Sequence, residues 1–409
     1  MCVMHIEHLS LHNFRNYARL EISLPTGPIL LYGSNAQGKT SLLEAIYYLA
    51  TSRSPYTTSD RQLINWNAHR DMLPFARIGA EIVRANRVFN RIEIILTQQA
   101  NGTDSEHFQK DVRINGVSRR VMDLIGQINV VMFLPQDLTL VEGPPAERRR
   151  YMNVTLCQTD ADYCRALASF EKVLIQRNAL LKRIAEKQGS PYELDYWNEQ
   201  ITSSAGILVA GRQKLLRELE VKARQIHHDL SGGEEDLELK YRPGFLPTAN
   251  NTGQLSFEVL GMDLNRQLSA DEIMEQYQAR LTELQAEEIA RGMTLIGPQR
   301  DELRLMVNGY DLGLYGSRGQ NRTAVMALKL AELEWMRDTI GEWPILLLDE
   351  VIAELDAHRR AFLLNRINGA SQVLLTTTEP DIFTPTFLEN AARWHIRQGQ
   401  IISTSDTTS

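Results

Sequence analysis

The stretch Gly33-Ser34-Asn35-Ala36-Gln37-Gly38-Lys39-Thr40 has the spacing G-x4-G-K-[ST]. The apolar run at residues 28–32 before it is typical of a strand, and residues 41–49 after it have the pattern of a helix. In this context backbone N–H groups and a helix N-terminus can face phosphate oxygens. Lys39 would reach the β- and γ-phosphates, and the Thr40 hydroxyl would ligate Mg²⁺. The stretch therefore predicts a phosphate-binding loop and a nucleotide-binding protein, rather than an ordinary glycine-rich turn.

Length and composition are those of a soluble globular protein. The 409 residues suffice for two or three domains, and 43% of them are hydrophobic. No apolar run approaches the ~20 residues that a membrane helix needs, and the N-terminal residues lack the layout of a signal peptide. Cys2, Cys157 and Cys164 form no C-x-x-C pair, so neither a zinc site nor a disulfide framework is indicated. We expect a reducing, cytoplasmic compartment and no membrane partner.

The formal net charge of −7 argues against a protein that coats nucleic acid by bulk attraction. It leaves room for a local basic face, because phosphate contacts depend on where lysine and arginine side chains lie. Three runs are candidates: Arg119-Arg120, Arg148-Arg149-Arg150 and Arg359-Arg360. Taken alone, each run is more typical of a solvated or salt-bridged surface.

Strand patterns dominate the first third of the chain. Strands are predicted at residues 3–11 and 18–24, with a polar turn at 11–17 between them, and again within 76–96 and at 128–134. The last eight residues, 402–409, are polar and are expected to be disordered.

Residues 146–230 follow a helical pattern nearly throughout. Gly189-Ser190-Pro191 would break it into two long amphipathic helices that form an antiparallel pair. Whether this pair packs in a local bundle or protrudes as a short arm stays open. A further helix should begin after Ser269, with Glu272 at the capping-box spacing, and run to about residue 291. These patterns predict an α/β protein with a discontinuous nucleotide-binding lobe, residues 1–135 and 293–409, and a mainly helical lid domain, residues 136–292.

Two later segments carry groups that suit a nucleotide site. The aliphatic run 345–348 ends in Asp349 and Glu350, which places a carboxylate where it can hold Mg²⁺ at the carboxyl edge of a parallel sheet. The next acid along the chain is suited to polarise an attacking water. Ser317-Arg318-Gly319-Gln320 opens a helix, so its serine cap and exposed backbone N–H groups form a second anion-binding feature.

The order of these parts resembles an ATP-binding-cassette ATPase of the chromosome-maintenance (SMC-like) branch. That order is phosphate loop, Gln136 in a Q-loop position, an S-x-G-Q signature, the acidic strand and the loop Glu354-Leu355-Asp356. Further strings narrow the resemblance to the RecF family of bacterial recombination mediators, over residues 3–401. These strings are L-H-N-F-R-N-Y at 11–17, F-L-P-Q-D-L at 133–138, G-P-P-A-E-R-R-R-Y at 143–151 and G-P-Q-R-D-E-L at 297–303. The resemblance implies an SMC-head-like ATPase lobe with mixed sheets and an inserted helical domain.

The same resemblance implies roles for individual residues. The ATP-binding residues would be Gly33, Ser34, Asn35, Ala36, Gln37, Gly38, Lys39, Thr40, Arg15, Ser317, Gly319 and Gln320. Thr40, Asp349 and Gln136 would hold Mg²⁺.

In hydrolysis, the resemblance makes Glu350 the general base and Gln136 the sensor of the γ-phosphate. Lys39, which would reach the β- and γ-phosphates, is the third catalytic residue. Ser317 and Gly319 would touch the γ-phosphate bound to a second protomer. This sequence departs from the wider cassette pattern in two places: Thr376-Thr377-Thr378 stands where many such ATPases carry a switch histidine, and Tyr315-Gly316 replaces the usual Leu-Ser start of the signature.

As a function, the resemblance implies an ATP-dependent DNA-binding protein of DNA repair, replication and the SOS response. It would dimerise around two ATP molecules, hydrolyse them slowly, mark single-strand/double-strand junctions at gaps, and help to load recombinase with a RecR-type partner. The alternatives are the ATPase subunit of a membrane transporter and a small-molecule kinase with a phosphate loop. The helical insert and the R-R-R and G-P-x-R-D strings favour the first interpretation, and stimulation of ATP hydrolysis by gapped DNA would distinguish it.

Overall fold

The computed structural model describes residues 4–70, 73–84, 89–100, 106–246 and 268–405. By their internal contacts the residues form two compact units. Unit 1 comprises Met1–Asp137 and Glu332–Ser409, and unit 2 comprises Leu138–Ala331. The first boundary lies two residues from the expected one. Residues 293–331, expected in the nucleotide-binding lobe, belong to unit 2, since the strand that begins at Glu302 pairs there with a strand at residues 237–242.

A largely parallel sheet forms one half of unit 1, in the order β15-β14-β3-β13-β12-β8. Its strands are β3 (Gly27–Tyr32), β8 (Val130–Phe133), β12 (Ile345–Leu348), β13 (Gln372–Thr377), β14 (Ala392–Arg397) and β15 (Gln400–Ser405). Strands β8, β12 and β13 are buried along their whole length, as parallel strands covered on both faces are. Strand β13 lies between β3 and β12, so the loop after β3 and the acids after β12 share one edge of the sheet.

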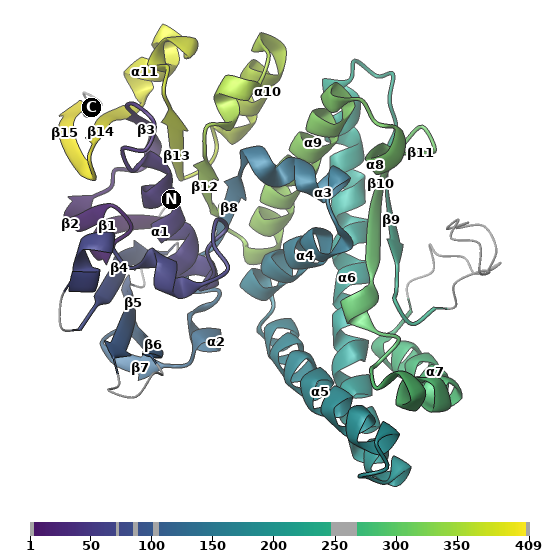
Figure 1. Cartoon of the computed structure of the whole chain (residues 1–409). Coiled ribbons are helices and arrows are strands. Elements are labelled where there is room, and N and C mark those ends of the chain that lie inside the picture. Colours follow the sequence, from purple (N-terminus) through teal and green to yellow (C-terminus); the bar gives the residue numbers. More distant parts are fainter. Residues whose placement is uncertain (1–3, 71–72, 85–88, 101–105, 247–267, 406–409) are drawn as a thin grey trace. The chain divides into compact units, whose positions relative to one another are not determined.

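An antiparallel sheet forms the other half of unit 1, in the order β2-β1-β4-β5-β6-β7. Its strands are β1 (His5–Phe14), β2 (Tyr17–Ser23), β4 (Phe75–Val83), β5 (Phe89–Ala100), β6 (Glu106–Ile114) and β7 (Val117–Arg119). Helix α1 (Lys39–Thr51) shares one hydrophobic core with strands of both sheets, through Leu42, Leu43, Ile46 and Leu49. This core fixes the helix that opens at the phosphate-binding stretch, and Figure 1 shows α1 behind β1 and β2.

Two predictions for unit 1 were wrong in detail. Residues 11–17 were expected to form a polar turn, but β1 runs to Phe14 and pairs with Tyr17, so only Arg15 and Asn16 make the turn. Residues 402–405 were expected to be disordered with the rest of the C-terminus, but they belong to β15, which pairs with β14. Residues 406–409 lie outside the described part.

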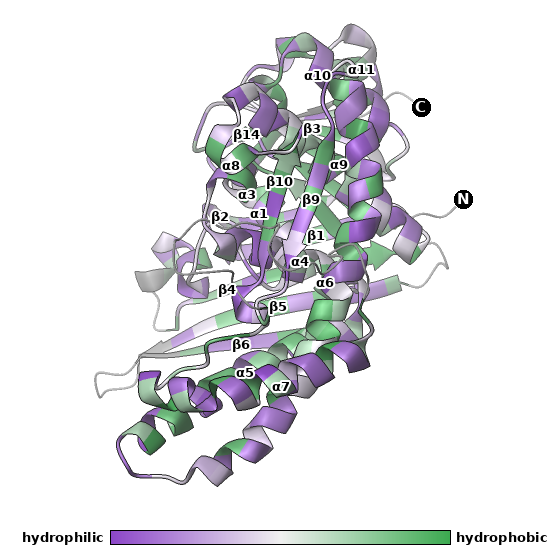
Figure 2. Cartoon of the chain, turned by 90° about the vertical axis from the view of Figure 1, so that its right-hand side faces the viewer, coloured by the Kyte–Doolittle hydropathy of each residue, from purple (hydrophilic) through white to green (hydrophobic). Residues whose placement is uncertain are grey.

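Unit 2 is mainly helical, as expected. Its longer helices are α4 (Pro145–Thr159), α5 (Ala161–Ala185), α6 (Leu194–Leu230), α7 (Ala270–Arg291) and the first part of α9 (Arg318–Ile340). The break between α5 and α6 and the Ser269–Glu272 capping box of α7 confirm the predictions, whereas the break at Asp160 between α4 and α5 was not foreseen. Figure 2 shows green and purple residues interspersed along α5 and α7, as in amphipathic helices. Helices α5, α6 and α7 pack on one another, which favours the local bundle over a protruding arm.

Beside these helices lies a small antiparallel sheet in the order β11-β10-β9, from β9 (Leu237–Arg242), β10 (Glu302–Val307) and β11 (Tyr310–Asp311). Within the described residues, no helix has the length and apolar character needed to cross a membrane.

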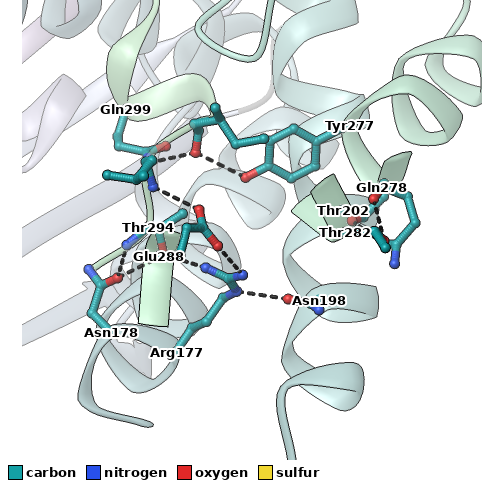
Figure 3. Close-up of polar contacts among 12 residues, drawn as sticks. Arg177, Asn178, Asn198, Thr202, Tyr277, Gln278, Thr282, Glu288, Thr294 and Gln299 are labelled. Atoms are coloured by element: carbon teal, nitrogen blue, oxygen red, sulfur yellow. Dashed lines mark hydrogen bonds and ion pairs between the residues drawn. The ribbon is translucent and has the colours of Figure 1, made fainter. Parts of the chain in front are cut away.

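A buried polar network holds the helices of unit 2 together (Figure 3). Arg177 of α5 and Glu288 of α7 are both fully buried, and Arg177 Nη2 donates to Glu288 Oε2 at 2.6 Å. The same guanidinium donates to Asn198 Oδ1 at 2.9 Å and to Thr294 Oγ1 at 2.7 Å. No local pattern in the sequence points to this pair, because Arg177 and Glu288 are 111 positions apart.

Candidate nucleotide site

The glycines of the phosphate-binding stretch occupy backbone conformations that other residues rarely adopt. Gly33 has a φ of 144° and Gly38 a φ of 116°. A Cβ on Gly33 would lie 2.4 Å from the carbonyl oxygen of Ile396, and one on Gly38 would lie 2.6 Å from Asn16 Nδ2. Helix α1 begins directly after Gly38, so its N-terminal N–H groups face the loop. The turn therefore depends on the close approach of the Ile396 backbone and the Asn16 side chain as well as on the positive φ angles of the two glycines.

Lys39 is held inside this turn. Its side chain is 3% exposed, and Nζ donates to the carbonyl oxygens of Gly33 at 2.8 Å and of Ser34 at 3.0 Å. Nζ also lies 3.4 Å from Glu350 Oε1. The structure thus brings together a buried ammonium group and the carboxylate that the sequence predicts as the general base.

Asp349 follows β12 and is buried. Its Oδ1 accepts hydrogen bonds from Thr40 Oγ1 at 2.9 Å and from Thr376 Oγ1 at 2.7 Å, and its Oδ2 accepts one from Tyr56 OH at 2.5 Å. Two of the three residues predicted to hold Mg²⁺, Thr40 and Asp349, are therefore in direct contact. Hydroxyl and carboxylate oxygens are the ligands that Mg²⁺ prefers, so the donor set fits the metal.

Sequence reasoning missed two of these contacts. Tyr56 lies in an irregular segment after α1, and no local pattern connects it with an acid 293 positions later. Thr376 had been noted only as the residue in place of a switch histidine. In the structure, its hydroxyl donates to Asp349 and accepts a hydrogen bond from Glu350 N at 2.8 Å, so it joins the two acids. Burial, reinforced by the charge of Asp349, raises the pKa of Tyr56 well above its ordinary value, which keeps this phenol a neutral donor.

Glu350 has a left-handed backbone, with a φ of 55°. For a residue with a Cβ this conformation is uncommon and carries strain, and such residues concentrate at functional sites. The side chain is 40% exposed, so water can reach the carboxylate.

Arg15, predicted to contact ATP, lies on the buried Glu44 of α1. Its Nε and Nη2 donate to Glu44 Oε2 and Oε1 at 2.8 and 2.6 Å, a bidentate pair, and Ser54 Oγ donates to the same carboxylate at 2.5 Å. This pair anchors the β1–β2 turn to α1. Contact of Arg15 with the nucleotide stays a prediction.

A second turn also supports the phosphate-binding stretch. Between β14 and β15, Gln398 N donates to Gln37 Oε1 at 2.8 Å and Gly399 N donates to the Gln37 carbonyl oxygen at 2.9 Å. On another side, Tyr17 OH donates to the Gly38 carbonyl oxygen at 2.9 Å. Neighbouring hairpins thus hold the loop in shape, which lowers the entropy cost of binding a phosphate chain.

Gln136 lies in the short 3₁₀ helix Pro135–Leu138 that follows β8. Strand β8 neighbours β12 in the sheet, so this residue comes from the same edge as Asp349, and its side chain is exposed. Its predicted roles toward Mg²⁺ and the γ-phosphate stay predictions.

The signature residues belong to unit 2. Ser317 precedes helix α9, where Gln320 N donates to Ser317 Oγ at 3.2 Å and Ser317 N donates to Gln320 Oε1 at 2.9 Å. Ser317, Arg318 and Gly319 are exposed. The structure therefore shows an open helix N-terminus with its serine cap in place.

Two of the three arginine runs serve the fold. Arg148 is buried and donates through Nη2 to Glu302 Oε1 at 2.8 Å, and Arg149 donates to the Asp301 carbonyl oxygen at 2.9 Å. The R-R-R string thus binds the G-P-x-R-D string within unit 2. Arg359 pairs with Asp356, and Arg360 donates to the carbonyl oxygens of Leu355 and Ile382.

Asp301, from the G-P-x-R-D string, is also structural. It is fully buried and accepts hydrogen bonds from Arg212 Nη1 at 2.5 Å, from Gly244 N at 2.7 Å and from the Tyr241 hydroxyl. The remaining run, Arg119-Arg120, is exposed.

Comparison with known proteins gives a consistent result over the whole length. The family model described as the RecF/RecN/SMC N terminal domain matches residues 5–400. The DNA replication and repair protein RecF of Chloroflexus aurantiacus is 43% identical over 410 residues, which cover 98% of this chain and all of that protein. Two solved structures of the recombination mediator protein RecF in the RecFOR pathway, described as RecF-ATPrS and RecF-ATP, are each 27% identical. They superpose with TM-scores of 0.83 and 0.81, over 99% of this chain and 99% and 98% of theirs.

Proposed function

The chain belongs to the RecF branch of the RecF/RecN/SMC family, and we propose that it is an ATPase of DNA repair that closes as a dimer on gapped DNA. Proteins of this family bind ATP and act in DNA replication and repair. Nothing in the comparisons supports the transporter alternative. The observation that carries the proposal is the cluster of Lys39, Thr40, Asp349 and Glu350 at one edge of the parallel sheet.

ATP would bind along the turn from Gly33 to Thr40. Lys39 would exchange its carbonyl partners and Glu350 for the β- and γ-phosphates, because phosphate oxygens carry more charge than a carbonyl. Thr40 and Asp349 would hold Mg²⁺, with Gln136 beside the γ-phosphate. The metal would neutralise charge that develops on the phosphate oxygens.

Glu350 would act as the general base. In the structure its carboxylate lies against Lys39, and binding of a phosphate chain to Lys39 would release it toward the attacking water. Thr376 would keep the two acids in register, since its hydroxyl bonds both to Asp349 and to the backbone N–H of Glu350.

Ser317, Gly319 and Gln320 would complete the site of a second protomer. An exposed helix N-terminus with a serine cap suits the γ-phosphate of a partner's ATP. Dimer closure would then need ATP, and hydrolysis would reopen the dimer.

The DNA bound would be gapped, at junctions of single and double strands, with a RecR-type protein as partner and the cytoplasm as the place of action. The RecFOR pathway, to which the similar RecF structures belong, supports the RecR-type partner, and the similarity covers 99% of this chain.

A mixing experiment tests the shared site. Lys39→Ala should lose ATP binding, because the phosphates lose their buried cation. Ser317→Arg should bind ATP yet neither dimerise nor hydrolyse, because a long side chain fills the place where the partner's γ-phosphate docks.

Mixed together, the two variants should recover ATPase activity stimulated by gapped DNA, since one site then has intact Lys39 and Ser317. Normal hydrolysis by Ser317→Arg alone, or an inert mixture under conditions where the wild type dimerises, would overturn the shared site.

A further inference from the structure

The amide of Gln320 has two partners that fix its orientation. Its Oε1 accepts from Ser317 N at 2.9 Å, and its Nε2 donates to Glu235 Oε1 at 2.8 Å. A backbone N–H can only donate and an ionised carboxylate can only accept. Glu235 therefore selects the orientation of the amide that satisfies Ser317.

This orientation has a consequence for the Ser317 hydroxyl. Ser317 Oγ accepts from Gln320 N at 3.2 Å, so one of its lone pairs faces the helix and its proton is left to donate elsewhere. If the Gln320 amide were reversed, its Nε2 would face Ser317 N, donor against donor, and the cap would loosen. The presentation of the Ser317 O–H group thus depends on a residue 82 positions earlier in the sequence.

Glu235 is itself held in place. It lies in the turn between α6 and β9, where Ser231 N donates to the His227 carbonyl oxygen and Asp236 N donates to Asn308 Oδ1, both at 2.9 Å. Its second oxygen, Oε2, lies 3.5 Å from Nε2 of the fully buried His227. The two oxygens of Glu235 thus face different partners, one on the last turn of α6 and one on the first turn of α9.

We propose that Glu235 is a positioning residue for the signature: it aligns Ser317, through Gln320, for the γ-phosphate of a partner subunit. This inference rests on the shared site proposed above. Glu235 touches neither ATP nor its own phosphate loop in this scheme, so its loss should spare ATP binding. Misplacement of a group by about 1 Å can cost about 100-fold in rate.

Three variants separate positioning from folding. Glu235→Ala removes the acceptor and should lower turnover by about 10–100-fold, with ATP affinity within a few-fold of wild type. Glu235→Gln keeps an oxygen that can accept from Gln320 Nε2 and should regain most of the turnover. Glu234→Ala, on the exposed neighbouring residue of the same turn, is the matched control and should retain wild-type turnover and melting temperature.

Mixing experiments show in which subunit Glu235 acts. Mixing Glu235→Ala with Lys39→Ala should restore activity, because the Lys39→Ala subunit supplies an intact Glu235 and Ser317 to its partner's ATP. Mixing Glu235→Ala with Ser317→Arg should restore none, because both variants damage the same half of the site.

Wild-type turnover of Glu235→Ala would overturn the inference. The inference would also be overturned if Lys39→Ala protein restored the activity of Ser317→Arg but did not restore the activity of Glu235→Ala. If Lys39→Ala fails to complement even Ser317→Arg, the shared site itself is wrong, which is a different failure. If Glu235 only stabilised the fold, Glu235→Ala would lower the melting temperature. The recovery of ATPase activity would then not differ between the two mixtures in the way described.

Discussion

Asp349 accepts hydrogen bonds from Thr40, Tyr56 and Thr376, three hydroxyl groups from three distant parts of the chain. A buried carboxylate needs such partners, because an unpaired buried charge is costly. The same donors set the direction of the lone pairs that would face Mg²⁺. At the scale of single residues, the geometry of the site therefore depends on the neighbours of Asp349 as much as on the residues predicted to touch ATP.

Glu350→Gln tests the general base. Mg²⁺–ATP should stay bound through Lys39, Thr40 and Asp349, and affinity should hold or tighten because the neutral amide competes less for Lys39. Turnover should fall by about 10²–10⁴, the usual cost of losing a general base, and leave a long-lived ATP dimer. Phosphate release and size-exclusion chromatography measure these effects, with Glu389→Gln, an exposed acid of unit 1, as control. Turnover within a few-fold of wild type would mean that another group activates the water.

Tyr56→Phe tests the support of Asp349. The substitution removes one donor to Oδ2 and keeps the ring, so the fold should hold. Loss of such a partner of a metal-ligating group typically costs about 10–100-fold in metal affinity or activity. We expect the Mg²⁺ concentration for half-maximal ATPase activity to rise by at least about 10-fold. An unchanged Mg²⁺ dependence, equal to that of the exposed-tyrosine control Tyr192→Phe, would show that Thr40 and Thr376 suffice.

Helices α5, α6 and α7 pack through apolar side chains and through a buried ion pair between Arg177 and Glu288, which Figure 3 shows. Arg177 and Glu288 are 0% exposed, and Asn198 and Thr294 accept hydrogen bonds from Nε and Nη1 of the guanidinium. Glu288 also accepts from Leu295 N at 2.8 Å, so the pair joins the end of α7 to the segment that leads into β10. This network fixes how the helices pair, which apolar stripes alone would leave free to slide.

Arg177→Met should destabilise unit 2 strongly. It leaves the buried Glu288 without its counter-charge, which typically costs about 3–5 kcal/mol. The free energy of unfolding in urea measures the effect. Arg291→Met, on the helix that carries Glu288, is the matched control. Its partner is Glu287, the two side chains are 62% and 47% exposed, and the loss should stay below about 1 kcal/mol. Equal losses for the two variants would contradict a structural role for the buried pair.

At the scale of the whole molecule, the chain combines a net charge of −7 with a proposed DNA substrate. Arg148, Arg149, Arg359 and Arg360 are engaged within their own units, so these two sequence runs do not mark the face that meets DNA. In the proposed closed dimer, contact with phosphates would depend on exposed cations of both subunits, which would make DNA affinity depend on ATP.

DNA binding should accordingly need ATP and fall steeply with salt. Each phosphate contact adds about 0.9 to the slope of log affinity against log salt concentration. A gel-shift series on gapped DNA, with and without ATP, measures both dependences, and Lys39→Ala protein is the control that should show no ATP effect. A flat salt response, or equal binding without nucleotide, would argue against an ATP-closed clamp.

Features that depend on neighbouring residues could be predicted from the amino-acid sequence. The Gly33-to-Thr40 turn, the acidic strand end, the Ser269 cap and the break between α5 and α6 depend on residues a few positions apart, so their spacing identifies them. The R-R-R and G-P-x-R-D strings were recognisable for the same reason, although what they do in the fold was not.

Contacts between distant side chains could not be predicted in this way. Four of these contacts join positions from 85 to 293 residues apart: Tyr56–Asp349, Arg177–Glu288, Arg148–Glu302 and Glu235–Gln320. A hydrogen bond or ion pair carries no periodicity along the chain, and its partners are selected by how sheets and helices pack. Arg177 is an example: its burial among apolar residues of α5 is explained only by Glu288, which the packing of the helices brings opposite it.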